Sequence, residues 1–394
     1  MNKKYQFLLM LATFSLSSSV FAQAGEIRIV HIHSMTGPQE DLGRQTRLGL
    51  QIGLDYATNG TRMLHGKKIV LIEKDDQGKP DVGKALLAAA YSDDKADIAI
   101  GPTMSNVALA MLPVAEEYKK VLIVEPAVAD SITGDKWNRY IFRTGRNSTQ
   151  DAVANAAAID GPGVSIATLA QDYAFGKDGV RALKAAIKKG TVVHEEYAPP
   201  TTSDFTASAQ RIIDKLKDRP GRKVIWILWS GAGNPYKIID MDLKRYGIEV
   251  ASFGNTFAAM AAYKNLPGMQ GASTYYFGLP QNKVNDYLVA EHQKRHGIPP
   301  DTFTAGGFSA GVAAVTALRK TGGETGSAKL IEAMEGMSFE SPKGTMTFRK
   351  EDHQAMQSMY HFKIKVDPAL AWGVPELVKE IKPEEMAIPV ANKR

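Results

Sequence analysis

The chain contains no cysteine among its 394 residues. That absence excludes disulfide bonds, cysteine-ligated metal centres and thiol redox sites. It also excludes a lipid anchor attached to an N-terminal cysteine. The fold must therefore be held together without covalent crosslinks.

Long apolar runs are missing after the N-terminal segment. Residues 1–24 combine two lysines, an apolar stretch and small residues that end in Val20-Phe21-Ala22. This order is typical of a secretory signal peptide, whose apolar core is too short for a permanent membrane span. No later segment approaches the roughly 18 uninterrupted apolar residues that a spanning helix needs. Since there is no lipid-anchoring cysteine, we expect a soluble periplasmic protein.

A strong excess of one charge is also missing. The formal net charge is +6, and removing Lys3 and Lys4 with the signal peptide takes away two positive charges and leaves +4. The sequence has no run of basic residues of the kind that marks a nucleic-acid surface. We therefore expect no nucleic-acid partner.

Enzyme signatures either are absent or lack their context. Residues 307–311 read Gly-Phe-Ser-Ala-Gly and match the G-x-S-x-G nucleophile elbow. That elbow needs a buried strand before it, and residues 301–306 make a poor strand. We expect Ser309 in the first turn of a helix that runs to Leu318. A periplasmic serine hydrolase that uses Ser309 is kept as a disfavoured alternative.

Metal and cofactor motifs give no better candidate. His292 and His296 lie four residues apart on a predicted helix, but there is no HExxH motif and no evident third ligand, so we expect surface histidines. His31 and His33 share one face of the first strand, where packing at a sheet end explains them equally well. The glycine spacings fit neither a P-loop nor a dinucleotide fingerprint. We predict no metal and no cofactor.

Strand-like and helix-like segments alternate along the chain. In the first part, strands are expected at 26–32, 68–74, 98–100 and 121–124, and helices at 43–56, 80–93 and 106–118. The rhythm restarts after Gly145, with helices at 151–159, 176–189, 204–217 and 235–246 and strands at 165–170, 192–197, 224–228 and 250–253. Such alternation predicts parallel sheets with helices on both faces. We therefore predict an α/β protein with two doubly wound, Rossmann-like lobes, whose ligand lies beyond the carboxyl ends of the strands.

A series of short motifs follows this architecture in order. It comprises Ser34-Met35-Thr36-Gly37-Pro38, Gly43, Asp75-Asp76, residues 100–105, residues 126–133, Phe142-Arg143-Thr144, residues 172–176, and Gly306 with Phe308 and Ala310. Taken together, their order and spacing resemble the leucine/isoleucine/valine-binding protein family of ABC transporters. The resemblance covers nearly the whole chain after residue 24.

The resemblance implies a type I periplasmic-binding fold that crosses between its lobes three times, near Gly145, Phe277 and Gln357. Residues 25–145 with 278–356 would form lobe 1, and residues 146–277 with 357–394 would form lobe 2. The family captures an amino acid or small carboxylate between the lobes and delivers it to a membrane permease. The resemblance thus implies a non-enzymatic protein, which we expect to be a monomer. A sensory protein of the same fold is an alternative.

The resemblance also places a ligand site, at Leu42, Ser105, Asn106, Ala127, Ala129, Phe175 and Thr256. Ser105 precedes a predicted helix, and its hydroxyl and the first N–H groups of that helix could bind a carboxylate. A helix-capping role for Ser105 is equally open. Of Trp226 and Trp229, strand alternation puts at most one in the pocket.

Three of these positions depart from the pattern of amino-acid binders. Ala129 stands where many of them have Ser or Thr, Phe175 lacks a tyrosine hydroxyl, and Thr256 cannot neutralise an ammonium. Burying an ammonium without an acidic partner is costly. Glu125 or Asp172 could supply that acid, although each has another explanation. The sequence therefore leaves open an amino acid or an amine-free aromatic or aliphatic acid.

Overall fold

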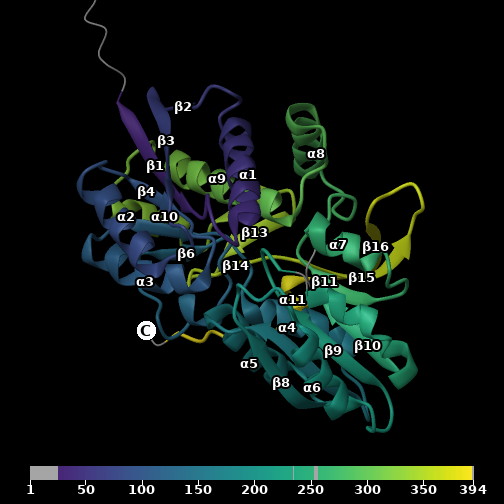
Figure 1. Cartoon of the computed structure of the whole chain (residues 1–394). Helices are drawn as coiled ribbons and strands as arrows, with labels where there is room; N and C mark the ends of the chain where they lie inside the picture. Colours follow the sequence, from purple (N-terminus) through teal and green to yellow (C-terminus); the bar gives the residue numbers. More distant parts are fainter. Residues whose placement is uncertain (1–24, 234, 253–255, 393–394) are drawn as a thin grey trace, which may run out of the picture.

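Two lobes make up the computed structural model, which describes residues 25–233, 235–252 and 256–392 (Figure 1). The predicted signal peptide, residues 1–24, lies outside the described residues. Each lobe is built on its own parallel sheet. None of the described helices is long and apolar enough to cross a bilayer.

Lobe 1 contains a six-stranded sheet in the order β2-β3-β1-β4-β5-β6. The strands are β1 (Glu26–His33), β2 (Met63–Leu64), β3 (Lys67–Asp75), β4 (Ile98–Ile100), β5 (Val121–Val124) and β6 (Ile141–Arg143). All neighbours run parallel except the short β2–β3 pair. Parallel pairing puts the carboxyl ends of β1, β4, β5 and β6 at one edge of the sheet, which faces lobe 2.

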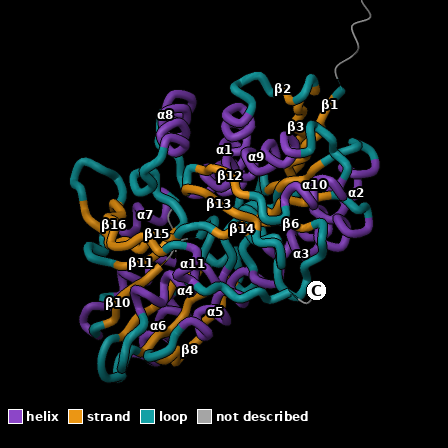
Figure 2. The backbone as a smooth tube through the Cα atoms, turned by 180° about the vertical axis from the view of Figure 1, so that it is seen from behind, coloured by secondary structure: helices purple, strands orange, loops and turns teal. Residues whose placement is uncertain are grey.

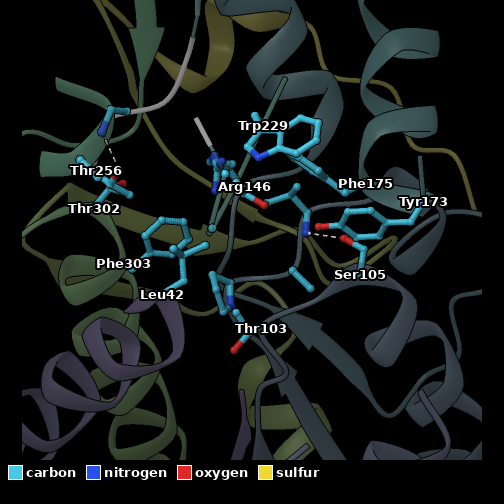
Figure 3. Close-up of a pocket in the computed structure, with 18 of the residues that line it drawn as sticks. Leu42, Thr103, Ser105, Arg146, Tyr173, Phe175, Trp229, Thr256, Thr302 and Phe303 are labelled. Carbon is cyan, nitrogen blue, oxygen red and sulfur yellow. Dashed lines mark hydrogen bonds between the residues drawn. The ribbon is translucent and has the colours of Figure 1, made fainter. Parts of the chain in front are cut away.

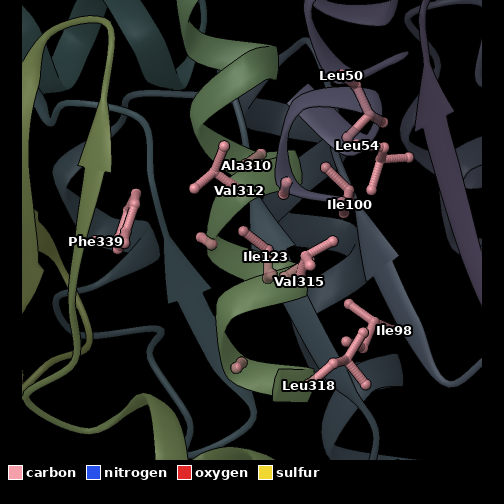
Figure 4. Close-up of a cluster of buried hydrophobic side chains, with 14 of the residues drawn as sticks. Leu50, Leu54, Ile98, Ile100, Ile123, Ala310, Val312, Val315, Leu318 and Phe339 are labelled. Atoms are coloured by element: carbon pink, nitrogen blue, oxygen red, sulfur yellow. The ribbon is translucent and has the colours of Figure 1, made fainter. Parts of the chain in front are cut away.

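Helices cover both faces of this sheet. They are α1 (Glu40–Ala57), α2 (Pro80–Ser92), α3 (Ser105–Glu117), α8 (Lys283–His296), α9 (Thr302–Lys320) and α10 (Ser327–Met334). Ile98, Ile100 and Ile123 of the sheet pack against α1 and α9 in the lobe 1 core (Figure 4). Helices α2 and α3 pack on the opposite face. The buried strands read as apolar runs because both faces are covered.

Lobe 2 repeats the plan with a four-stranded parallel sheet in the order β10-β9-β7-β8. Its strands are β7 (Ser165–Gln171), β8 (Thr191–Ala198), β9 (Lys223–Leu228) and β10 (Ile248–Ser252). Its helices are α4 (Ser148–Ile159), α5 (Ala174–Ala186), α6 (Thr206–Leu216) and α7 (Phe257–Tyr263), with the 3₁₀ helices η2 (Pro235–Met241) and η3 (Leu243–Tyr246). Helices α4 and α5 cover one face and α6 and α7 the other.

Two small antiparallel sheets and two short helices complete the described chain (Figure 2). One sheet contains β11 (Gln270–Ser273), β15 (Met359–Val366) and β16 (Gly373–Ile381); the other contains β12 (Ser338–Ser341), β13 (Gly344–Phe348) and β14 (Ala355–Met356). The remaining elements are η1 (Asp130–Ile132) and α11 (Pro383–Met386).

The segments between the lobes are hydrogen-bonded to each other. The side-chain nitrogen of Gln354 donates to the Gly145 carbonyl (2.8 Å), and that of Gln357 donates to the Thr144 carbonyl (3.2 Å). After α11, the Ile388 carbonyl accepts from Arg349 Nη1 (2.7 Å), so the tail contacts the segment that precedes β14. The exact lobe boundaries stay a prediction.

The predicted α/β architecture with two lobes is confirmed, but two local predictions are wrong. Residues 235–246 do not form one helix, because Asp242 adopts a left-handed conformation (φ 52°) between η2 and η3. Ser309 is not in a first helical turn, because Asp301 caps α9 and the helix begins at Thr302. The predicted strand at 250–253 is observed up to Ser252, and residue 253 lies outside the described residues.

Glycines at the contact between α1 and α9 allow the backbones of the two helices to approach each other closely. A Cβ at Gly307 would lie 1.9 Å from the Thr46 carbonyl oxygen. We expect Gly307→Ala to lower the free energy of unfolding by about 1–3 kcal/mol, because an overpacked site must move backbone. Urea unfolding of both proteins measures this.

The matched control is Gly25→Ala, where an added Cβ would meet no atom closer than 3.7 Å, and that atom belongs to the Lys67 side chain. We expect this exposed variant to change stability by no more than about 0.5 kcal/mol. Equal unfolding midpoints for the two variants would contradict the close packing of α1 on α9.

Candidate ligand-binding site

A cavity lies in the cleft between the two lobes (Figure 3). Its volume is about 180 Å³, which suits a small ligand rather than a drug-sized one. The lining residues are Leu42, Thr103, Ser105, Pro126, Ala127, Val128, Arg146, Tyr173, Phe175, Trp229, Ser230, Gly231, Gly233, Tyr236, Thr256, Ala258, Ala259, Thr302 and Phe303.

These residues come from strand carboxyl ends and from first helical turns. Thr103 follows β4, the stretch 126–128 follows β5, and Trp229 follows β9. Ser105 and Phe175 lie in the first turns of α3 and α5. The cavity therefore lies where an open α/β sheet is expected to bind its ligand, and helix N-termini direct partial positive charge toward it.

Large apolar and aromatic side chains form part of the wall. Leu42 and Phe303 approach from lobe 1, and Phe175 and Trp229 approach from lobe 2 (Figure 3). Tyr236 of lobe 2 also lines the cavity. Trp229 is held in place because its indole N–H donates to the Ala232 carbonyl (3.0 Å). The Tyr236 hydroxyl is hydrogen-bonded to Ser252 (2.9 Å) and Tyr263 (3.1 Å), so its ring is fixed as well.

Ser105 lies where the chain turns from β4 into α3. Its hydroxyl oxygen accepts from the backbone N–H groups of Val128 (3.3 Å) and Ala129 (3.2 Å). These bonds leave the hydroxyl proton to be donated to another acceptor. The capping hypothesis is wrong, because Met104 is the N-cap residue of α3 and no side chain caps it. The first N–H groups of α3 therefore lack a side-chain cap and lie beside the cavity.

Arg146 is the one charged residue among the lining residues of the described chain. Its side chain is only 13% exposed, and its Nε donates to Asp151 Oδ1 at 2.9 Å. Burial raises the pKa of Asp151 to about 6, although the nearby Arg146 lowers it. Burial also raises the pKa of the Tyr173 hydroxyl to about 12, so this second polar group stays neutral.

The acidic side chains near the cleft do not line the cavity. Glu125 is buried and accepts from the Thr144 hydroxyl (2.9 Å), and burial raises its pKa. Asp172 is 48% exposed and pairs with Lys177 (3.1 Å). Asp301 is buried and accepts from the backbone N–H groups at the start of α9.

Five of the seven predicted site residues line the cavity: Leu42, Ser105, Ala127, Phe175 and Thr256. Asn106 and Ala129 are not lining residues; the Ala129 N–H instead donates to Ser105. Their roles in binding stay predictions. Trp229 lines the cavity while Trp226 is buried in the lobe 2 core, so the prediction that at most one of them does is confirmed.

The sequence interpretation missed Arg146, Tyr173, Tyr236, Thr302 and Phe303. Arg146 had a usable signal, because it directly follows the crossing predicted near Gly145 and a strand carboxyl end. Thr302 and Phe303 had none, because residues 301–306 were not expected to begin a helix.

The other motifs do not contribute to the cavity. Ser309 is fully buried inside α9, where its hydroxyl donates to the Ala305 carbonyl (2.7 Å). The prediction of a surface position is wrong for His292, which is fully buried and whose Nδ1 lies 2.8 Å from the Ile298 carbonyl just after α8. His296 is exposed. A nucleophile elbow and a two-histidine surface site therefore both lack their geometry.

His31, His33 and Glu73 form the one group of described residues close enough to hold a metal ion. Both Glu73 oxygens, however, accept from Arg47 Nε (2.8 and 2.9 Å). The two imidazoles stack at 4.1 Å, and burial lowers both pKa values, that of His33 to about 4. The group is a neutral ring pair beside an ion pair.

The cleft, the two parallel sheets and the apolar cavity define a two-lobed binding protein. The chain belongs to the periplasmic binding protein family, whose sequence model matches residues 26–369. This family comprises the solute-binding components of ABC importers.

Known relatives agree with this membership. A Rhodopseudomonas palustris protein, described as an ABC-type branched-chain amino acid transporter, is 62% identical, with a TM-score of 0.82 over 94% of this chain and 100% of that one. The Leu/Ile/Val-binding protein homolog 6 of Brucella abortus is 26% identical over 89% of this chain and 90% of its own. A solute-binding protein of R. palustris, solved with 3,4-dihydroxybenzoic acid, is 26% identical, with a TM-score of 0.77 over 91% of this chain and 98% of that one.

The buried Asp301 beside the cavity gives a pH dependence that can be measured. Burial raises its pKa from 3.8 to about 7. Between these values the unfolded chain has released the proton while the folded chain keeps it, so stability falls as the pH rises through this window and is constant above it. Asp301→Asn keeps a capping oxygen but does not titrate. We expect its free energy of unfolding, relative to that of the native protein, to be higher at pH 8 than at pH 4.5 by at least about 1.4 kcal/mol.

Urea unfolding of both proteins at the two pH values, without ligand, tests this expectation. Because the other titrating groups are shared, the difference between the proteins isolates Asp301. A difference that is the same at both pH values would contradict the raised pKa.

Proposed function

We propose that this chain captures a small carboxylate without an amine in the interlobe cavity and delivers it to an ABC importer. Residues 1–24 would direct it to the periplasm, where it would act as a monomer without catalysis or cofactor. The observation that carries the ligand class is the charge of the cavity: Arg146 lines it, and no described carboxylate does.

The geometry supports a carboxylate held between two kinds of donor. Ser105 and the uncapped start of α3 supply neutral donors, and Arg146 supplies a charged one. Charge-assisted hydrogen bonds to an anion are about twice as strong as neutral ones. A ligand ammonium would meet the Arg146 charge and no acidic partner, which is costly in a buried site.

The walls favour an apolar or aromatic body on this carboxylate. Phe175, Trp229 and Phe303 offer ring faces and edges against which a planar ring can pack. One relative was solved with 3,4-dihydroxybenzoic acid, which supports this choice of ligand. We propose aromatic monocarboxylates first and short aliphatic acids second.

A branched-chain amino acid is the second candidate. The description of the 62% identical relative as a branched-chain amino acid transporter favours it. In that case the ligand amine would need backbone carbonyls or side-chain hydroxyls in place of the missing carboxylate.

A thermal-shift screen of matched pairs separates the two candidates. The pairs are phenylalanine with 3-phenylpropionate, leucine with 4-methylpentanoate, and benzamide with benzoate or 3,4-dihydroxybenzoate. We expect the amine-free carboxylates to raise the melting temperature, since each retains the anion and avoids a buried ammonium. Stabilisation only by the amino acids would refute the proposed ligand class and favour the second candidate.

Variants of the two donors test how the carboxylate is held. We expect Ser105→Ala and Arg146→Gln each to weaken binding of the best carboxylate by about 1.5–3 kcal/mol, since each removes a hydrogen bond to a charged group. Calorimetry measures the dissociation constants.

Lys177→Gln is the matched control, because this cation is exposed near the start of α5 and pairs with Asp172 outside the cavity. It should leave the affinity within about twofold, as expected for a screened surface charge. Unchanged affinity in both Ser105→Ala and Arg146→Gln would contradict the assignment of the carboxylate site.

A further inference from the structure

Direct contacts join the two lobes at the cleft beside the cavity. The Ala232 N–H, which follows β9 in lobe 2, donates to the Pro38 carbonyl in lobe 1 at 2.7 Å. The Gln39 side-chain nitrogen donates to the Ser230 carbonyl at 3.1 Å. We refer to the contact of Pro38 and Gln39 with Ser230, Gly231 and Ala232 as the latch.

Both sides of the latch are rigidly held. Gln39 is only 2% exposed, and it precedes α1, which packs on the lobe 1 core. On the other side, Gln171 Nε2 donates to the Ser230 carbonyl (2.9 Å), and Gln171 Oε1 accepts from the Ser230 N–H (3.2 Å) and hydroxyl (3.1 Å). Because Gln171 ends β7, the Ser230 peptide is fixed to the lobe 2 sheet.

Gly231 makes this approach possible. Its φ of +73° lies in the left-handed region that favours glycine. A Cβ on Gly231 would lie 2.4 Å from Gln39 Oε1 and 2.5 Å from the Pro38 carbonyl oxygen. The second of these atoms is backbone, so any larger residue would have to hold the lobes apart.

We infer that Gln39 and Gly231 form an affinity-determining latch, which stabilises the closed lobes through contacts that do not include the ligand. A ligand trapped behind these contacts leaves only after they break, so the latch sets its dissociation rate. Closed molecules without ligand are stabilised in the same way. This inference uses the cleft of the proposed function and does not depend on the ligand being amine-free.

The test measures lobe separation and ligand release in the same proteins. Because the chain has no cysteine, Arg44→Cys and Lys237→Cys, at exposed positions in the two lobes, give a clean pair for spin labels. Double electron–electron resonance then measures the distribution of distances between the two spin labels with and without 3,4-dihydroxybenzoate. Stopped-flow mixing measures the dissociation rate of that compound.

We expect Gln39→Ala to raise the dissociation rate by about 2- to 10-fold, as expected for a lost neutral hydrogen bond. Gly231→Ala should raise it further and shift the distances to longer values even with saturating compound. Gly221→Ala is the matched control: it has a φ of +74° and one backbone oxygen 2.7 Å from the added Cβ, but it lies at the opposite end of β9. It should leave both readouts unchanged.

The two proposals fail in different ways. If the native protein does not respond to 3,4-dihydroxybenzoate, that ligand is refuted. The spin-label distances without ligand still test the latch, because the native protein should show a short-distance population that Gly231→Ala lacks. If the native protein and Gly231→Ala give the same ligand-free distances, or bind the compound and release it at the same rate, the latch is refuted while the ligand class stands.

Discussion

A parallel strand followed by a helix brings its own carboxyl end and the first turn of that helix to one edge of the sheet. In this chain both sheets direct that edge at the same cleft, so the polar groups that face the cavity come from strand ends and helix starts. Ser105 and Phe175 owe their positions to this constraint. The cavity can therefore be fixed by rigid elements of both lobes, while the segments that join the lobes carry little of its lining.

The electrostatics of the cavity follow from what burial does to each charge. Burial raises the pKa values of Glu125, Asp151 and Asp301, so these carboxylates are stable only where a cation or backbone N–H group compensates them. Asp151 is paired with Arg146, Asp301 accepts from backbone N–H groups at the start of α9, and Glu125 accepts from the Thr144 hydroxyl. Arg146 faces the cavity while Asp151 holds its Nε, so the side chain is oriented before any ligand arrives. A preoriented cation loses little conformational entropy on binding an anion.

The sequence predicts those parts of the structure that follow a regular pattern of apolar residues, and it does not predict contacts that lack such a pattern. The strands and helices of both lobes alternate along the sequence, so their order was predictable, as was the place of Ser105 at the start of a helix. Phe175 was placed by the family resemblance alone. Asp301 was not recognised as a helix cap, and this single error hid Thr302 and Phe303 and misplaced Ser309. His292 contacts the turn after its helix. The pattern of residues within the helix does not show that this turn covers the histidine. Contacts between lobes, such as Pro38 with Ala232, join residues almost 200 positions apart and have no local signal.

Binding and closing are carried by different kinds of interaction in this fold. The cavity relies on a buried guanidinium and a helix start, whose attraction for an anion is little screened once the cleft excludes solvent. The latch relies on neutral amide and backbone groups, which neither titrate near neutral pH nor respond to salt as exposed charges do. A change in a lining residue outside the latch, such as Ser105 or Arg146, can therefore alter which anion is bound without altering the contacts that close the lobes. Conversely, Gly231 constrains closure through its backbone shape alone, so the ligand class and the residence time of the ligand can vary independently.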